Sequence, residues 1–289
     1  MKIFTIGGSG LVGSRIAELL KDKYTLDDLS LTNGVDITDP TSLDVIRNDK
    51  EHEVVLHFAA KADVEGCEKD KPLGEKGPAY IINVGGTQHV VDACKVSHKK
   101  ILYISTDFVF DGKKDLPYKY TEEDQPDPVN WYAMTKYNGE EVVRNSGLNF
   151  AILRIAYPFR ADDFAMKKDF VHAIMGRLAN NQPITAVTDH IMTPTFIDDI
   201  AYAIDAVIAN NATGIYHVVG SQSLNPYEAF TLMAEKFGYN KSLISKTTRE
   251  EFFKGKAPRP FNLSISNDKI KKLGVTMRTF EEGLKEIKL

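Results

Sequence analysis

Short apolar runs alternate with amphipathic segments along the first half of the chain. Strands are expected at Lys2–Ile6, within Tyr24–Thr32, at Val54–Ala60, at Ile101–Ser105 and at Phe150–Ile155. Helices are expected at Leu11–Leu20, Ala79–Cys94 and Trp131–Asn145, the first of which has apolar residues at helical spacing. This alternation predicts an α/β fold, in which a doubly wound parallel sheet of the Rossmann type carries helices on both faces.

In the second half of the chain the regular alternation of strands and helices ends. Helices are expected at Lys167–Asn180, Ile197–Ala209 and Pro226–Phe237, and a late strand at Ile215–Val219. The segment from Ser221 onward is more polar and poor in strand patterns. We therefore expect a cofactor-binding domain over residues 1–157, with about 196–219 packing back onto its sheet. Residues 158–195 and 220–289 should form a smaller C-terminal substrate-binding lobe.

The composition is that of a soluble globular protein, with 43% hydrophobic and 26% charged residues. The net charge of −4 is spread along the chain without a basic tract, which argues against a nucleic-acid partner. The longest apolar runs are far shorter than a membrane span. The two cysteines, Cys67 and Cys94, form neither a disulfide framework nor a zinc motif. We expect a cytoplasmic protein with no membrane, nucleic-acid or metal partner.

A glycine-rich turn separates the first expected strand from the first expected helix. Gly7, Gly10 and Gly13 form a G-x-x-G-x-x-G pattern. In a dinucleotide site the first glycine makes the turn, the second admits the pyrophosphate and the third allows close packing of helix on strand. The helix N-terminus attracts the phosphates. Spaced glycines alone are weak evidence, but this strand–turn–helix context predicts a dinucleotide-binding site.

The sequence says less about which dinucleotide binds. An acidic residue about twenty positions beyond the turn would bind the ribose hydroxyls, but Leu31, Thr32 and Asn33 occupy that region. Asp27 and Asp28 lie slightly earlier and suit either a ribose contact or a solvated turn. No arginine is nearby for a 2′-phosphate. The expected cofactor is NADH or NADPH, with a mild preference for NADH.

Tyr132 and Lys136 lie four residues apart on an expected helix and therefore share one face. A phenol titrates near pH 10, and a neighbouring ammonium is expected to lower its pKa toward that of a useful acid. A surface tyrosine stacked on a lysine is the common alternative for this spacing. It is disfavoured here because the pair follows both the glycine-rich turn and Thr106 at a strand end. Thr106 either supplies a hydroxyl to a substrate carbonyl or only caps the strand.

The segment around Thr106 resembles a known family. Ile104–Gly112, which reads ISTDFVFDG, is similar to the STDYVFDG signature of dTDP-4-dehydrorhamnose reductases. The similarity continues through the tyrosine and lysine positions to Gly139-Glu140, and also includes Asp36–Pro40, Ala59–Lys61, Thr193–Thr195 and Pro258–Pro260. It spans nearly the whole chain. The chain is thereby identified as a member of this family, within the extended short-chain dehydrogenase/reductase superfamily.

The resemblance implies reduction, by NADH or NADPH, of the 4-keto group of a nucleotide-linked 6-deoxy sugar, most specifically dTDP-4-dehydro-L-rhamnose. It implies that Tyr132 donates a proton, that Lys136 tunes it and holds the cofactor ribose, and that Thr106 and Asp107 contact the sugar. The cofactor-binding residues it implies are Gly7, Gly10, Leu11, Val12, Gly13, Asp36, Ile37, Ala59, Ala60, Lys61, Tyr132 and Lys136. A homodimer is compatible with this reading.

Several positions depart from the family and bear on the identity of the sugar. After Arg154 the family commonly has T-S-W-V-Y, whereas this chain reads I-A-Y-P-F, so that Tyr157 takes the place of a tryptophan near the sugar. Ala133 replaces the usual glycine. Arg259, between two prolines, suits either a substrate phosphate or a surface salt bridge. Tyr157 and Arg259 are therefore expected substrate-binding residues.

Two other functions are compatible with these motifs. A nucleotide-sugar epimerase of the same superfamily also uses the tyrosine–lysine pair, and it would turn over without added NAD(P)H. The regulatory subunit of methionine adenosyltransferase resembles the same reductase family and acts as a binding protein. An inactive relative is expected to lose the tyrosine–lysine pair, which this chain retains.

Overall fold

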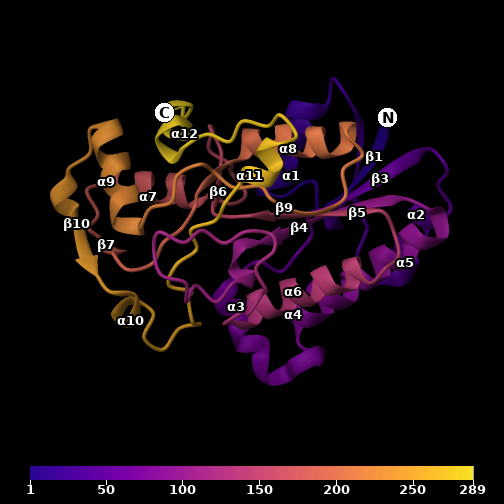
Figure 1. The fold of residues 1–289 in the computed structure, drawn as a ribbon, viewed down its shortest axis with the longest axis horizontal. Coiled ribbons are helices and arrows are strands. Elements are labelled where there is room, and N and C mark those ends of the chain that lie inside the picture. Colours follow the sequence, from indigo (N-terminus) through magenta and orange to yellow (C-terminus); the bar gives the residue numbers. More distant parts are fainter. Residues whose placement is uncertain (289) are drawn as a thin grey trace.

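The computed structural model describes residues 1–288, and its centre is a six-stranded parallel sheet (Figure 1). In spatial order the strands are β2 (Thr25–Leu29), β1 (Lys2–Ile6), β3 (His52–His57), β4 (Lys100–Thr106), β5 (Phe150–Ile155) and β9 (Gly214–His217). The chain runs from β1 outward to β2, then crosses back so that β3 lies on the other side of β1. This change of direction opens a crevice at the carboxyl ends of β1 and β3, where ligands bind in sheets of this kind.

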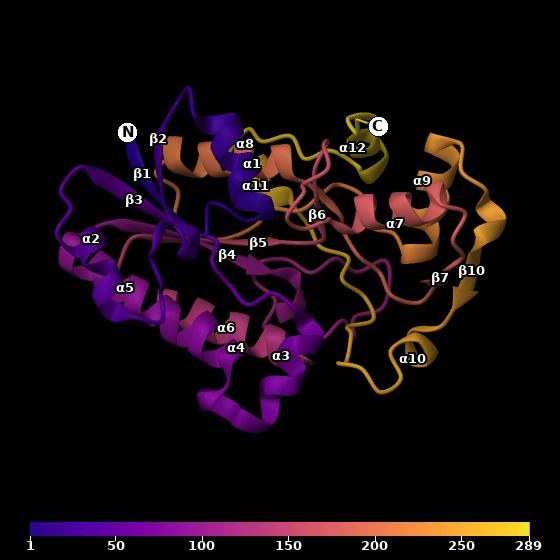
Figure 2. The ribbon, with the colours of Figure 1, turned by 180° about the vertical axis from the view of Figure 1, so that it is seen from behind.

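Helices cover both faces of the sheet, as Figure 2 shows. One face carries α1 (Leu11–Leu20), α8 (Ile197–Ala209) and α11 (Asp268–Lys271). The other face carries α2 (Asp44–Arg47), α5 (Thr87–Ser97) and α6 (Trp131–Arg144). Val54 belongs to the hydrophobic cluster of the first face and Val55 to that of the second, because successive side chains of a strand point to opposite faces. The doubly wound fold that the sequence predicted is confirmed.

The helix that was expected as one unbroken element over Ala79–Cys94 contains an irregular section. It runs as α4 (Pro78–Tyr80), a π-helical turn at Ile81–Gly86 and then α5. A further short helix, α3 (Val64–Asp70), precedes it and was not expected. π-Helical turns are rare and occur frequently at functional sites, and this turn lies beside the crevice described below.

A smaller lobe adjoins the end of the sheet at which β5 leads into β6 (Figure 1). Its helices are α7 (Phe170–Ala179), α9 (Pro226–Phe237), α10 (Arg249–Phe252) and α12 (Phe280–Lys285). Two small parallel sheets complete it, one pairing β6 (Pro158–Phe159) with β8 (Thr195–Phe196), the other pairing β7 (Ile184–Val187) with β10 (Ile244–Thr247). Aromatic side chains, including Phe159, Phe196 and Phe280, fill its core.

The sequence did not indicate β7 or β10. Each strand has four residues, and within its two-stranded sheet each pairs with the other. Ser245 and Lys246 are exposed, so β10 has too few buried positions to show an alternating pattern. By contrast, α1, α8 and α9 begin and end at the residues that the sequence indicated.

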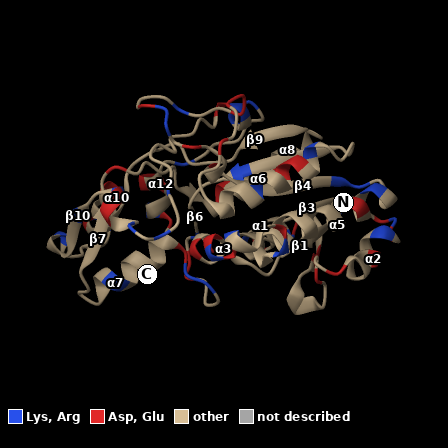
Figure 3. Cartoon of the chain, turned by 90° about the horizontal axis from the view of Figure 1, so that it is seen from below, with Lys and Arg blue, Asp and Glu red and all other residues tan. Residues whose placement is uncertain are grey.

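Charged residues of both signs are interspersed over the sheet region and the lobe on the side seen in Figure 3. Within residues 1–288, no helix combines the length and apolar character needed to cross a membrane. No cluster of three or more histidine, cysteine, aspartate or glutamate side chains suited to a metal ion is found in the same range.

Candidate active site

The glycine-rich turn joins β1 to α1 and is confined by close contacts. Gly7 has a φ of +75°, and a Cβ added there would lie 2.9 Å from the Ala59 backbone. A Cβ on Gly13 would lie 2.7 Å from the Cα of Gly8, so this glycine packs the helix against the turn rather than against the strand. A Cβ on Gly10 would meet only the Gly7 carbonyl, at 3.4 Å, among the described residues. The open space at Gly10, before the first turn of α1 with Leu11 and Val12, suits a pyrophosphate.

Asp28 supports this turn from the end of β2. Its carboxylate accepts hydrogen bonds from the Gly8 backbone N–H at 2.8 Å and from the Ser30 hydroxyl at 2.6 Å. Asp27 instead lies 2.7 Å from a ring nitrogen of His52. Both aspartates belong to β2, so the expected turn is wrong, although Asp27 is exposed to solvent. Asp28 is fixed where a strand-end carboxylate contacts a cofactor ribose in folds of this kind.

The residues after β3 form the opposite side of the crevice. The backbone N–H of Lys61 donates to Asn83 Oδ1 at 2.8 Å, and Asn83 Nδ2 donates to the Lys61 carbonyl at 3.1 Å and to Thr135 Oγ1 at 2.9 Å. Asn83 lies in the π-helical turn and was not singled out in the sequence. Its only signal is the glycine pair that follows it inside a helical pattern. Asn83 fixes the loop containing Ala59, Ala60 and Lys61 to α6.

Two further expected cofactor residues, Asp36 and Ile37, lie in the loop after β2. Ile37 is buried against Gly86, and its carbonyl is 2.8 Å from His89 Nδ1. The Asp36 carboxylate accepts hydrogen bonds from the backbone N–H and the hydroxyl of Thr38. The loop is therefore held against the same irregular helix that contains Asn83.

Tyr132 lies in the first turn of α6, against the end of β4. Asn130 caps this helix by accepting a hydrogen bond from the Ala133 N–H at 2.9 Å. Thr106, the last residue of β4, lies beside the Tyr132 phenol. The Thr106 hydroxyl also accepts a hydrogen bond from the Phe108 N–H at 3.2 Å and so caps the turn after the strand. The structure thus shows the cap, and a contact of Thr106 with a substrate carbonyl stays a prediction.

Lys136 does not act on Tyr132 as expected. Its ammonium donates to the Tyr103 hydroxyl at 2.7 Å and to the Ile104 carbonyl at 2.8 Å, and only 2% of the residue is exposed. Burial lowers the pKa of Lys136 to about 7. Burial raises the pKa of Tyr132, and the charge of Asp107 adds to this rise. The expected lowering of the phenol pKa by Lys136 is wrong in this structure, because the lysine side chain points under the helix onto β4.

Asp107 is the most perturbed carboxyl group beside Tyr132. Burial raises its pKa to about 7, opposed by hydrogen bonds from Thr106 and the local backbone. Its Oδ1 accepts a hydrogen bond from the Thr106 hydroxyl at 3.0 Å. Its Oδ2 is buried without a partner in the described part of the chain. A buried polar atom without a partner is unusual in a folded protein and is common where a ligand binds.

Tyr157 lies near Asp107, and Arg259 lies near Tyr157. The Tyr157 hydroxyl lies 2.8 Å from His190 Nε2, and the charge of Asp107 contributes to a raised pKa of the phenol. Arg259 donates to Glu65 in α3 at 2.8 Å, and its guanidinium lies over the Phe253 ring. Of the two alternatives for Arg259, the structure shows the salt bridge. To bind a substrate phosphate, Arg259 would have to break its salt bridge with Glu65 or contact both groups at once.

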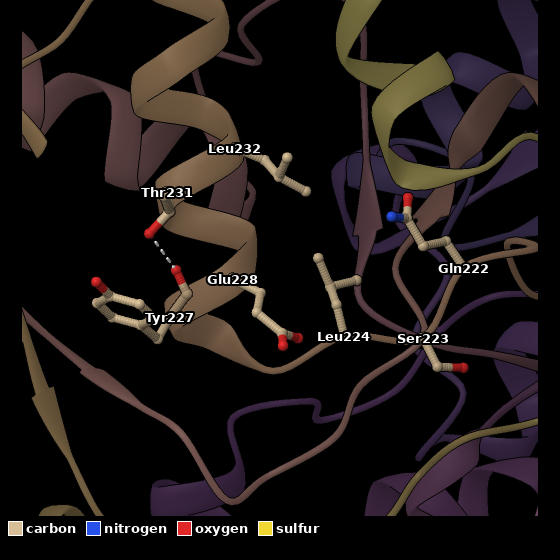
Figure 4. A pocket seen from close by; sticks show the side chains of 7 residues that line it. All are labelled: Gln222, Ser223, Leu224, Tyr227, Glu228, Thr231 and Leu232. Atoms are coloured by element: carbon tan, nitrogen blue, oxygen red, sulfur yellow. Dashed lines mark hydrogen bonds between the residues drawn. The ribbon is translucent and has the colours of Figure 1, made fainter. Parts of the chain in front are cut away.

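A separate cavity of about 350 Å³ lies on the lobe at the start of α9 (Figure 4). Leu224, Tyr227 and Leu232 form its apolar walls, and the Thr231 hydroxyl is bonded to the Tyr227 carbonyl beside it. None of the residues predicted from the sequence lines this cavity. Most of the predicted residues lie instead at or just after the carboxyl ends of β1, β3, β4 and β5, and therefore at one edge of the parallel sheet.

Comparison with known proteins agrees with this geometry. The chain is 29% identical over 287 residues to the spore coat polysaccharide biosynthesis protein SpsK of Bacillus subtilis, covering 99% of this chain and 96% of the relative. It is 30% identical to a dTDP-4-dehydrorhamnose reductase of Mycobacterium tuberculosis, covering 90% of this chain and 81% of that protein. A crystal structure of dTDP-4-dehydrorhamnose reductase from Bacillus anthracis in complex with NADP superposes with a TM-score of 0.88, at 26% identity over 99% of this chain and 98% of that one. The profile of the RmlD substrate binding domain matches residues 1–288, and the chain belongs to this family.

Proposed function

We propose that this protein reduces the 4-keto group of a nucleotide-linked 6-deoxy sugar, with dTDP-4-dehydro-L-rhamnose as the first candidate substrate. NADH or NADPH is the proposed reductant. The observation that carries the proposal is that the Tyr132 phenol, in the first turn of α6, lies beside Thr106 at the carboxyl end of β4. It lies at the same edge of the sheet as the glycine-rich turn, whose open position at Gly10 suits a dinucleotide.

The chain's own residues would supply the acid and the oxygen-binding group of such a reduction. A bound dinucleotide would supply the hydride. Tyr132 would give its phenolic proton to the carbonyl oxygen as negative charge develops there, while the Thr106 hydroxyl holds that oxygen. The raised pKa of Tyr132 keeps the phenol protonated at neutral pH. The acid is thus in its donating form before the reaction.

Under the same proposal, Asp28 determines whether NADH or NADPH is preferred. A carboxylate held at the end of β2 would bind ribose hydroxyls and repel a 2′-phosphate. NADH should therefore be used at least as well as NADPH. Steady-state kinetics with both cofactors test this, and a marked preference for NADPH would show that Asp28 does not reach the ribose.

The central test is NAD(P)H oxidation with a small panel of nucleotide-linked 4-keto-6-deoxy sugars. Sugar-dependent oxidation that needs added cofactor supports the reductase. Interconversion of sugars without added NAD(P)H would support an epimerase instead. A protein that binds NAD(P)H but turns over no panel member would favour a regulatory binding protein, such as the one that resembles this family in methionine adenosyltransferase.

A further inference from the structure

Tyr157 adopts a backbone conformation that aromatic residues rarely adopt. Its φ is +41°, in the left-handed region that disfavours L side chains. The ring is held between Phe108, at 6.1 Å between centroids, and Phe170, at 5.8 Å. Phe108 also contacts the Tyr132 ring, at 6.2 Å. Strain of this kind persists where the surroundings impose it and is concentrated at ligand sites. Tyr157 is thus turned toward the same space as the proposed acid.

His190 determines how the Tyr157 hydroxyl can form hydrogen bonds. His190 Nδ1 lies 2.7 Å from the Pro260 carbonyl, which can only accept, so Nδ1 carries the proton. Burial and the nearby arginines lower the pKa of His190 to about 4. The ring is therefore neutral at neutral pH, and Nε2 is an acceptor. The hydrogen bond of 2.8 Å between this nitrogen and Tyr157 then has the phenol as donor.

The only remaining hydrogen-bonding capacity of the Tyr157 hydroxyl is its oxygen lone pair. Its proton is committed to His190, and burial with the charge of Asp107 raises the pKa of the phenol, so it stays neutral. The unpartnered Oδ2 of Asp107 is the nearby second polar atom. A ligand group that suits the Tyr157 oxygen must donate a hydrogen bond, whereas Asp107, whose pKa is raised to about 7, can either accept or donate one. Sugar hydroxyls donate, whereas a keto oxygen or a phosphate oxygen does not.

We propose that Tyr157 and His190 form a recognition pair for the sugar of the substrate. Tyr157 Oη accepts a hydrogen bond from a sugar hydroxyl, and His190 is a positioning residue that acts through Tyr157. The placement of Tyr157 and Tyr132 around Phe108 puts this hydroxyl close to the reacting carbonyl. Within the proposed substrate class, the preferred sugars are accordingly those that keep their hydroxyls beside C4. This inference rests on the proposed function and specifies its substrate class.

Binding measurements test the pair without requiring turnover. Calorimetry with the full-length protein and NAD⁺ would compare dTDP-L-rhamnose with dTDP, and UDP-L-rhamnose with UDP. The affinity ratio of each sugar nucleotide to its free nucleotide isolates the part due to the sugar. Tyr157→Phe keeps the ring and its packing and removes only the hydroxyl. His190→Asn keeps an amide donor for the Pro260 carbonyl and removes the acceptor for Tyr157.

We expect Tyr157→Phe to lower the sugar-dependent affinity ratio about tenfold, the value of one good hydrogen bond, and to leave the affinity for free nucleotide within about twofold. His190→Asn should lower the ratio in the parent but have no further effect in the Tyr157→Phe background, because it acts through that hydroxyl. Tyr24→Phe is the matched control. It removes a phenol–carboxylate hydrogen bond to Asp205, beside α8 and away from the crevice, and should leave the ratio unchanged.

The outcomes separate this inference from the proposed function. If the parent binds no sugar nucleotide better than its free nucleotide, or if Tyr157→Phe leaves the ratio intact, the recognition pair is overturned. Additive effects of the two substitutions would overturn the role of His190. If the ratio depends on Tyr157 as expected but no 4-keto sugar is reduced, the recognition pair stands and the reductase proposal fails.

Discussion

The two walls of the crevice are built in different ways. The sheet wall, formed by Gly7, Gly10, Thr106, Tyr132 and Lys136, consists of strand ends and helix starts. The lobe wall, formed by Tyr157, His190 and Arg259, consists of loop residues whose side chains hold one another. The Tyr157 hydroxyl contacts a residue 33 positions away, and Arg259 pairs with a carboxylate 194 positions away.

This difference separates chemistry from recognition. On the sheet wall the backbone fixes the position of each group, because parallel strands end at one edge and the helix N-terminus follows the turn. On the lobe wall each side chain is held by another side chain, so replacing one of them changes the hydrogen bonds or ion pairs of its neighbours. We expect the sheet wall to determine whether the reaction occurs and the lobe wall to determine which sugar enters. The predictions below test that division, in order of decreasing expected effect.

The largest effect should come from the acid on the sheet wall. Tyr132→Phe removes one hydroxyl and little volume, so the fold and the dinucleotide site should persist. Turnover should fall by on the order of 10²–10⁴, the usual contribution of a positioned acid. Steady-state rates on dTDP-4-dehydro-L-rhamnose, with cofactor affinity measured in parallel, check this. Equal rates in the parent and the variant would remove Tyr132 from the role of acid.

Asp107, which lies between the walls, should make stability depend on pH. Its folded pKa, raised by burial to about 7, exceeds the ordinary value near 4 of an unfolded chain. Between these values the unfolded chain is ionised and the folded one is not, so stability falls as pH rises from about 4 to about 7 and then levels off. The loss is at most about 4 kcal/mol.

Asp107→Asn should remove this dependence, which urea unfolding at pH 5 and pH 7.5 would measure. Asp111→Asn is the control, since hydrogen bonds and a nearby lysine lower the pKa of Asp111 and its contribution has the opposite sign. Parallel pH dependences in the parent and Asp107→Asn would show that Asp107 is solvated.

A smaller effect is expected at the glycine-rich turn. Gly10→Val places a side chain in the open space before α1 and should raise the dissociation constant of NADH at least about tenfold, roughly 1.4 kcal/mol. Gly176→Val in α7 makes the same chemical change at an open position of the lobe and controls for the general effect of a glycine-to-valine change on the fold. Fluorescence titration with NADH measures the dissociation constant of each variant. Unchanged affinity in a folded Gly10→Val protein would place the dinucleotide elsewhere.

The smallest effect should be that of the salt bridge on the lobe wall. Arg259 and Glu65 are partly exposed, so Glu65→Gln should change the free energy of unfolding by no more than about 1 kcal/mol. If Arg259 also binds a substrate phosphate, Arg259→Gln should raise KM while kcat stays near the parent value, and Glu65→Gln should not. Equal KM values for the two variants would limit Arg259 to a structural role.

The elements that the sequence predicted best are those with long periodic patterns. Helix α8 has eight buried residues in one stripe, and β4 has six consecutive buried positions, so each carried a clear signal. The four-residue strands β7 and β10 and the π-helical turn carried none, because their conformation depends on neighbours from distant segments. Asn83 was missed for the same reason: its partners are Lys61 and Thr135.

By itself the sequence determined the order of the central strands and the long helices, the glycine-rich turn, the threonine at a strand end, and the tyrosine and lysine on one helix face. Those features are local, set by periodicity, capping and backbone sterics. Only the tertiary structure decided that Lys136 points at Tyr103, that Arg259 pairs with Glu65, and that His190 fixes the Tyr157 hydroxyl. The direction of a side chain and its pKa depend on burial and on charges brought together by folding, which no local pattern contains.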